Sequence, residues 1–135
     1  IIHSDLHPHN FIFKDERLKA ILDFDNLRVG ARGIDIAFVM HRLIRQYLVE
    51  HKSEEQGSAI QKSIRTFLKA YKEHNTPPNT KNLFALLIEE ELKKIFYILE
   101  NHYLYNDTLW SSHIPKHFAA INEIRIMQDE LEKIK

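Results

Sequence analysis

The segment His3-Ser4-Asp5-Leu6-His7-Pro8-His9-Asn10 carries a dense set of reactive side chains in the pattern H-x-D-x-x-x-x-N. A second polar segment, Asp23-Phe24-Asp25, begins thirteen residues after that pattern ends. Between the two lie two short runs rich in β-formers, Phe11–Lys14 and Leu18–Leu22. The polar residues Asp15-Glu16-Arg17 separate these runs, and the sequence therefore predicts a β-hairpin.

The hairpin gives this order of polar residues a chemical meaning. Its two ends meet, so Asn10 and Asp23 are expected to lie beside one another. An amide oxygen and a carboxylate oxygen are ligands that Mg²⁺ prefers, whereas imidazole and thiolate are not. Phosphoryl transfer needs magnesium to neutralise the phosphates and a group that accepts the proton of the attacking hydroxyl. Asp5 lies one loop away from the two expected ligands and could be that base.

These motifs resemble the catalytic loop and metal-binding segment of the aminoglycoside phosphotransferase and choline kinase family, whose members are relatives of protein kinases. Protein kinases use H-R-D-x-x-x-x-N followed by D-F-G. Asp25 takes the place of the final glycine, a departure that the small-molecule branch tolerates. Gly33-Ile34-Asp35-Ile36-Ala37 also resembles that branch. The resemblance that rests on motifs covers residues 1 to about 48.

The resemblance implies an α+β, mostly helical structure: the C-terminal lobe of a protein-kinase-like fold, with a small β-hairpin at the catalytic cleft. Residues 1–135 would form this one catalytic and substrate-binding domain. The implied activity is ATP-dependent phosphoryl transfer to a hydroxyl of a small molecule, as in aminoglycoside, choline or homoserine kinases. ATP and Mg²⁺ are the implied cofactors, and the acceptor, the oligomeric state and the choice between ATP and GTP stay open.

The resemblance also implies roles for single residues. Asp5 would be the catalytic base, and Asn10 and Asp23 would be the magnesium ligands. His7 and Asp25 are weaker candidates for contacts with the transferred phosphate or the metal.

Two further residues would support the catalytic loop. His3 would pack below it, and Asp35 would open a buried helix and accept hydrogen bonds from the backbone of the loop. Taken without the resemblance, Asp35 is more simply explained as the N-cap of that helix.

After Gly33 the apolar residues follow helical spacing, which predicts four helices. The first contains Ile36–Leu48, and the second contains Ile60–Tyr71 and ends at Pro77-Pro78. A third, long helix is expected after a cap at Asn79 or Thr80, and a last one begins near Pro115.

Several residues of the third and fourth helices carry more specific expectations. The buried stripe of the third helix should include Leu92, Phe96 and Tyr103, together with residues on the same face. Tyr103, Tyr105 and Trp110 are expected in the core. Glu89-Glu90-Glu91 is expected to be a solvated helix face, or in part the lining of a pocket for a cationic acceptor.

Composition excludes several classes of protein. Nineteen basic residues balance nineteen acidic ones, so no net field favours nucleic acid or an anionic membrane. There is no cysteine, which excludes disulfides and thiolate metal sites. No apolar run approaches the roughly 18 residues that span a bilayer. Without the pattern of a secretory signal at residue 1, a cytoplasmic location is expected.

Two other interpretations stay open. His3, Asp5, His7 and His9 alternate along the chain and could bind zinc or a metal pair in a hydrolase, although Pro8 disrupts regular strand pairing. The chain could also be a non-catalytic remnant or binding module. The family needs an N-terminal lobe that grips the nucleotide, yet the three glycines all follow the catalytic motif. That lobe is therefore expected to be missing from this chain.

Overall fold

The computed structural model describes residues 1–52, 55–76 and 78–134. The chain begins with a loop and a short 3-10 helix, η1 (Pro8–Asn10), followed by strands β1 (Phe11–Lys14) and β2 (Arg17–Ile21). Helices α1 (Arg32–Glu50) and α2 (Gln56–His74) come next. After η2 (Thr80–Asn82) come α3 (Leu83–Tyr105), η3 (Ser111–His113) and α4 (Ile114–Glu132). The protein is thus α+β and mostly helical, as the sequence predicts.

The strands form the predicted antiparallel hairpin. Asp15 and Glu16 make its tight turn, with φ angles of 51° and 58° that suit the right-handed twist of a two-residue hairpin loop. Arg17 was expected in the turn but pairs with Lys14 as the first residue of β2. The expected second strand, Leu18–Leu22, is shifted by one residue, because β2 begins at Arg17 and ends at Ile21.

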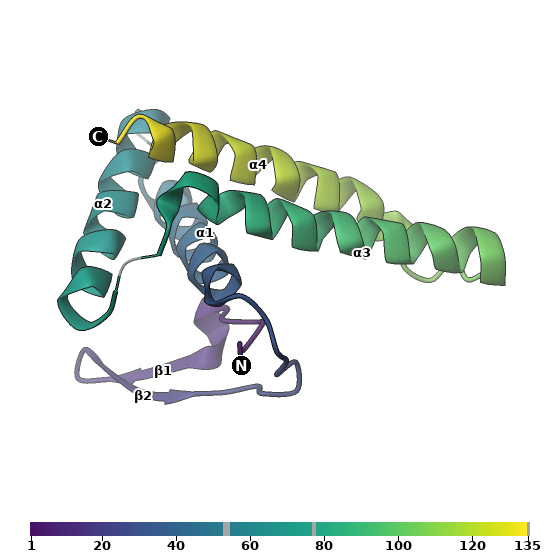
Figure 1. The fold of residues 1–135 in the computed structure, drawn as a ribbon, viewed down its shortest axis with the longest axis horizontal. Coiled ribbons are helices and arrows are strands. Elements are labelled where there is room, and N and C mark those ends of the chain that lie inside the picture. Colours follow the sequence, from purple (N-terminus) through teal and green to yellow (C-terminus); the bar gives the residue numbers. More distant parts are fainter. Residues whose placement is uncertain (53–54, 77, 135) are drawn as a thin grey trace.

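The hairpin lies below one end of α1, and α1 packs between α2 and α3 (Figure 1). Helices α3 and α4 run antiparallel as a long pair, and the far end of this pair extends away from the rest of the molecule (Figure 1).

The core forms where the four helices meet. It includes Met40 and Ile44 of α1, Ile64 of α2, Phe84 of α3 and Ile124 of α4, none of which is more than 2% exposed. Each such side chain contributes about 1.5–3 kcal/mol by leaving water. Phe84 is fully buried, and its replacement by alanine would cost about 3–5 kcal/mol because a cavity would remain.

Two expected helix caps are wrong. Ala31 rather than Asp35 is the N-cap of α1, and Asp35 lies inside the first turn of the helix. Asn79 caps the short helix η2, where its side chain accepts a hydrogen bond from the amide of Lys81. Pro77, half of the predicted stop signal after α2, lies outside the described residues.

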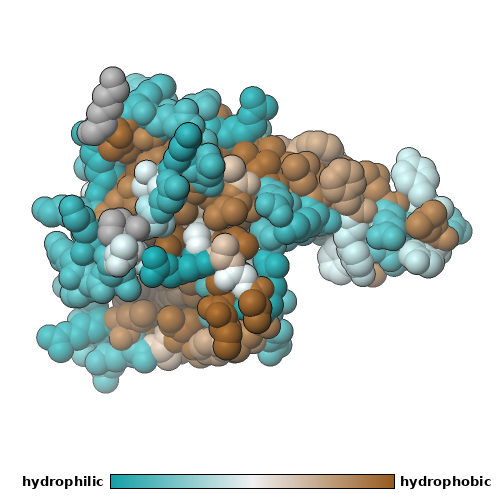
Figure 2. All heavy atoms as spheres, viewed as in Figure 1, coloured by the Kyte–Doolittle hydropathy of each residue, from teal (hydrophilic) through white to brown (hydrophobic). Residues whose placement is uncertain are grey.

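The expected burial of the α3 stripe is also wrong toward its end. Phe96 is 66% exposed and Tyr103 is 76% exposed, and the predicted core residues Tyr105 and Trp110 are exposed as well. The reason is tertiary, because this half of α3 lies in the arm that α3 and α4 form, which extends away from α1 and α2 (Figure 1). The corresponding arm in Figure 2 accordingly presents much apolar surface.

The triplet of glutamates differs from the expectation too. Glu89 is exposed, but Glu91 is only 5% exposed.

In the described parts of the chain, no helix is both long and apolar enough to cross a membrane.

Candidate active site

Asp35 holds the loop that carries Asp5. Its two carboxylate oxygens accept hydrogen bonds from the backbone amides of His3, at 2.7 Å, and Ser4, at 2.8 Å. Ser4 has a φ of 68°, a left-handed conformation that is uncommon for a residue other than glycine. Such a conformation persists where the surroundings enforce it, and here it sets the direction in which the chain enters Asp5.

Arg28 fixes the same loop from the other side. Its backbone and that of Ile2 form an antiparallel bridge, with N···O distances of 2.8 and 3.2 Å. Its Nε donates to Ser4 Oγ at 2.8 Å, and its guanidinium pairs with Glu90 on α3. The loop is therefore tied to α1 through Asp35 and to α3 through Arg28.

His3 connects the loop to the end of the hairpin. Its buried ring places Nε2 3.0 Å from the carbonyl oxygen of Leu22 and packs against Phe24 at 4.9 Å between ring centroids. Since a carbonyl only accepts, Nε2 carries the proton, and Nδ1 can accept a hydrogen bond from the amide of Asp5 at 3.4 Å. This ring thus joins the loop to the residue before Asp23.

Asn10 lies against Asp5. Its amide nitrogen Nδ2 donates to the Asp5 carbonyl at 2.9 Å and approaches Asp5 Oδ2 at 3.4 Å. These bonds use the nitrogen end of the amide and leave its oxygen Oδ1 available to a cation.

The backbone also places Asp23 beside Asn10. The amide of Leu22 donates to the carbonyl of Asn10 at 2.8 Å, so the two ends of the hairpin meet one residue before Asp23. Asp23 has a φ of 62°, and its side chain is exposed. Asp25 is exposed too, in a turn closed by the hydrogen bond from the Leu27 amide to the Phe24 carbonyl at 3.1 Å.

His7 caps η1 by accepting a hydrogen bond from the amide of His9 at 3.3 Å, and the two rings lie 4.4 Å apart. Burial lowers the pKa of His7, as do the charges of Arg42 and His9, so its imidazole is neutral at pH 7. Of His3, Asp5, His7 and His9, His3 is engaged with Leu22. Across residues 1–52, 55–76 and 78–134, no three His, Cys, Asp or Glu side chains are placed to hold a metal ion. The hydrolase site built on those four residues is not formed.

A polar cavity of about 460 Å³ opens on the side of Asp5 that faces α1 and α3. Its lining combines charged and apolar side chains: Ser4, Asp5, Asn26, Arg28, Ile34, Phe38, Arg42, Leu87, Glu90 and Lys94. Neither Asn10 nor Asp23 belongs to this lining. Asp5 therefore borders the cavity and also contacts Asn10, one of the two predicted metal ligands.

Sequence patterns missed three charged residues of this cavity: Arg28, Arg42 and Lys94. Glu90 belongs to the glutamate triplet that was expected in part to line a pocket, and it does line this one. Arg28 lies in a loop without a motif, and Arg42 and Lys94 occupy ordinary positions on helices. A weak signal did exist for Arg42, since a charged residue follows a long apolar run on a helix that is otherwise deeply buried.

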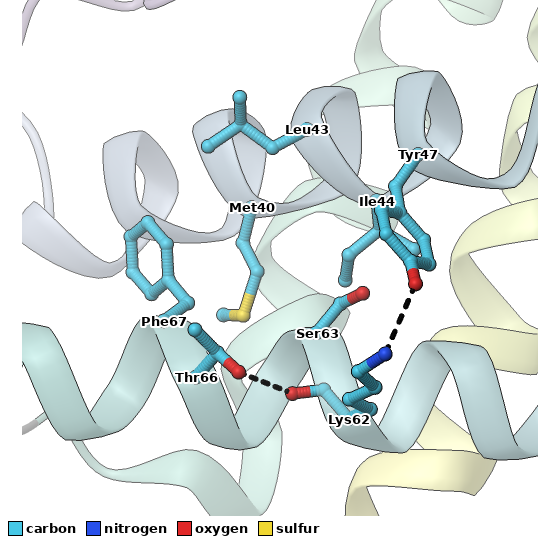
Figure 3. Close-up of a pocket in the computed structure, with 8 residues that line it drawn as sticks. All are labelled: Met40, Leu43, Ile44, Tyr47, Lys62, Ser63, Thr66 and Phe67. Atoms are coloured by element: carbon cyan, nitrogen blue, oxygen red, sulfur yellow. Dashed lines mark hydrogen bonds between the residues drawn. The ribbon is translucent and has the colours of Figure 1, made fainter. Parts of the chain in front are cut away.

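A second cavity, of about 380 Å³, lies between α1 and α2 (Figure 3). Its described lining is mainly apolar, with Met40, Leu43 and Phe67 among its members, and it contains neither a carboxylate nor an imidazole. Lys62 Nζ lies 3.3 Å from the hydroxyl of Tyr47 at one end. Without a carboxylate or an imidazole in this described lining, the cavity does not offer the chemistry found around Asp5.

Comparison with known proteins bears on the same part of the chain. The family model described as "Phosphotransferase enzyme family" matches residues 1–71, which contain the loop, the hairpin, α1 and most of α2. Searches of curated proteins and of solved structures found no match. Since the matched residues are more than half of the 135, the chain belongs to the phosphotransferase enzyme family.

Proposed function

We propose that this chain is the catalytic part of a small-molecule kinase, corresponding to the C-terminal lobe of a protein-kinase-like fold, with residues 1–135 as one domain. ATP would be the phosphoryl donor, the acceptor would be a hydroxyl on a small molecule, and the cytoplasm would be the location. The observation that supports it best is the contact between Asp5 and Asn10 in a loop that Asp35 holds, next to the hairpin end where Asp23 lies.

Asp5 would accept the proton of the acceptor hydroxyl as its oxygen forms a bond to the terminal phosphorus of ATP and ADP leaves. The carboxylate can reach the cavity, where an acceptor would bind, while its other neighbour is Asn10. The hydrogen bonds of Asp35 and Arg28 to the loop would keep the Asp5 carboxylate in place during the transfer. Such positioning of reacting groups is a large source of rate acceleration.

The residues present fit a magnesium ion. The free oxygen of Asn10 and the carboxylate of Asp23 are oxygen donors of the kind that Mg²⁺ binds, and the hairpin brings their backbones together. Bound there, the ion would neutralise phosphate charge on the side of Asp5 away from the cavity. His7 and Asp25 are further candidates for contacts in this region.

A nucleotide-gripping lobe would complete the site. The hairpin supports this proposal, since Phe13 is 62% exposed and Leu18 is 49% exposed on an otherwise short, two-stranded sheet. Apolar side chains of this kind are suited to contact with a second lobe or with a nucleotide base.

The proposal is tested by Asp5→Asn in the full-length protein that contains these residues. Turnover, measured as ATP consumption with a panel of hydroxyl compounds, should fall by about 10²–10⁴-fold. Nucleotide affinity should stay within about twofold, because the base does not hold the nucleotide. Asp129→Asn, on the exposed face of α4, is the matched control. Near-normal turnover in Asp5→Asn would show that Asp5 is not the base, and the absence of both ATP binding and ATP consumption in the unmodified protein would favour the non-catalytic interpretation.

A further inference from the structure

The cavity beside Asp5 carries more positive than negative charge. Its lining has three cationic and two anionic side chains, which are Arg28, Arg42, Lys94, Asp5 and Glu90. If Asp5 is the base, only Glu90 could attract a cationic acceptor. Glu90 is already engaged, since it pairs with Arg28 and accepts a hydrogen bond from Lys93 at 3.0 Å.

The neighbouring carboxylate, Glu91, is engaged as well. It accepts a hydrogen bond from Lys94 Nζ at 2.7 Å and lies 2.7 Å from His117 Nδ1. Burial raises the pKa of Glu91, but the hydrogen bonds from His117 and Lys94 together outweigh this effect. The net shift of the pKa is downward, so the carboxyl group is ionised at neutral pH. The glutamates near the cavity thus neutralise protein cations and leave no carboxylate for an acceptor cation.

Arg42 has the opposite character. It projects from α1 into the cavity lining, and its guanidinium lies over the ring of Phe38 at 5.0 Å from the centroid. Among the described residues, Arg42 has no carboxylate within ion-pairing distance, and its buried Nε has no hydrogen-bond partner. Burial and the charge of Arg45 lower the pKa of Arg42, while the charges of Glu91, Asp5 and Glu123 act in the opposite direction from a distance.

Because Nε is shielded from solvent, a ligand in the cavity would meet the terminal nitrogens of the guanidinium, which bind a planar oxyanion best through two parallel hydrogen bonds. A carboxylate has the matching shape, and it would pair with the one cation of the lining that has no ion-pair partner among the described residues. The side of Asp5 matters too. Asn10 and Asp23 lie outside this cavity, so the phosphate is expected on the other side of the base.

We propose that the acceptor is a small hydroxy acid, whose carboxylate binds Arg42 while its hydroxyl faces Asp5. This inference rests on the proposed function and restricts its substrate class. It excludes polycationic acceptors, because these would place further positive charge beside a guanidinium that has no ion pair among the described residues.

The test uses the full-length protein and three hydroxy acids (glycerate, 4-hydroxybutyrate and gluconate), each paired with its primary amide, with choline as a cationic acceptor. The amide keeps the hydroxyl and the size but removes the charge. At least one acid should accept phosphate from ATP, and the KM of its amide should be about 10–100-fold higher, the range expected for losing a charge-assisted pair of hydrogen bonds.

Arg42→Gln should raise the KM of the acid by the same factor and leave that of the amide within about twofold, with kcat and the KM for ATP little changed. Arg42→Lys keeps the charge without the planar fork, so its KM for the acid should lie between those of the unmodified protein and Arg42→Gln. This variant replaces Arg42→Gln if the latter does not fold. Arg45→Gln, one turn further along α1 and outside this cavity, is the matched control.

Three results would overturn the inference. If Arg42→Gln lowers kcat equally for acids and amides, Arg42 acts on the transferred phosphate and not on the acceptor. If choline or the amides accept phosphate and no acid does, the substrate class is wrong while the proposed kinase function stands. If no compound accepts phosphate and the protein does not bind ATP, the proposed function fails, and the inference fails with it.

Discussion

Asp35 and His3 are joined by a hydrogen bond across 32 residues of sequence, from the His3 amide to Asp35 Oδ2 at 2.7 Å. Because Asp35 lies on α1, whose neighbouring residues Ile36 and Ala37 are buried, the bond connects the loop to the buried core of the molecule. This single carboxylate thus holds the backbone next to Asp5 in position relative to the helical core.

Asp35→Asn should therefore lower both stability and turnover. Asparagine offers one acceptor oxygen, so one of the two loop amides would face an N–H₂ group in place of a carboxylate oxygen. Loss of a hydrogen bond to a charged group should reduce the free energy of unfolding by about 1.5–3 kcal/mol, measured by urea titration. In the full-length protein, kcat should fall more than nucleotide affinity changes, and a variant with unchanged stability would show that the loop does not depend on this carboxylate. Asp129→Asn again provides the control.

His41 should make stability depend on pH. It is 2% exposed, and burial together with the charge of Arg42 lowers its pKa from 6.5 to about 4, although Glu123 at 3.4 Å opposes the shift. Between pH 6.5 and 4 the unfolded state binds more protons than the folded state. The stabilisation is therefore complete above about pH 6.5 and is lost as the pH falls toward 4, by about 3 kcal/mol in total.

The measurement is the free energy of unfolding in urea at half-unit steps from pH 7.5 to 4. His41→Gln cannot titrate, so its profile should be flatter over this interval than that of the unmodified protein. His74→Gln, an exposed histidine at the end of α2, should keep the original slope. Equal slopes for all three proteins would contradict the role given to His41.

The sequence predicted the elements of the fold better than their packing. The spacing of apolar residues and the β-propensity of short runs were enough to predict the hairpin and four helices, because both signals are local in the sequence. They failed at Phe96 and Tyr103, where an apolar stripe continues along α3 beyond the point at which α1 can cover it. The expectation for Glu91 was wrong in the opposite direction, because this predicted surface residue is buried. It contacts His117 of α4, 26 residues away in the sequence.

The candidate site divides in the same way. Asp5, Asn10 and Asp23 could be singled out because they stand in short motifs whose spacing carries chemical meaning. The bonds that hold the loop could not be found from spacing. The loop-holding role of Asp35 came from the family resemblance, since its position alone predicted a helix cap. Arg28 reaches Ser4 from 24 residues away and Glu90 from 62. Contacts of this kind depend on how α1 and α3 pack, which no local pattern encodes.

The hairpin turn should tolerate, and gain from, a glycine. Glu16 adopts a φ of 58°, which costs a residue with a side chain about 1–2 kcal/mol, and its side chain forms no hydrogen bond or ion pair among the described residues. Glu16→Gly should raise the free energy of unfolding by about 0.5–1 kcal/mol after the entropy of the unfolded glycine is subtracted. Glu100→Gly, the same substitution on an exposed face of α3, should lower it by about 1 kcal/mol. A destabilised Glu16→Gly variant would contradict the left-handed turn.

Asp23→Asn should weaken the response to magnesium without disturbing the backbone. Asparagine tolerates the left-handed φ of 62° but removes the carboxylate charge that would attract the ion. Since even an indirect partner of a bound metal contributes about 10–100-fold to affinity, the magnesium concentration for half-maximal ATP consumption should rise by at least about tenfold. Asp15→Asn makes the same change at a φ of 51° at the far end of the hairpin, and it should leave magnesium dependence unaltered. If the two variants respond to magnesium alike, Asp23 does not hold the ion, and the hairpin end beside Asn10 has another role.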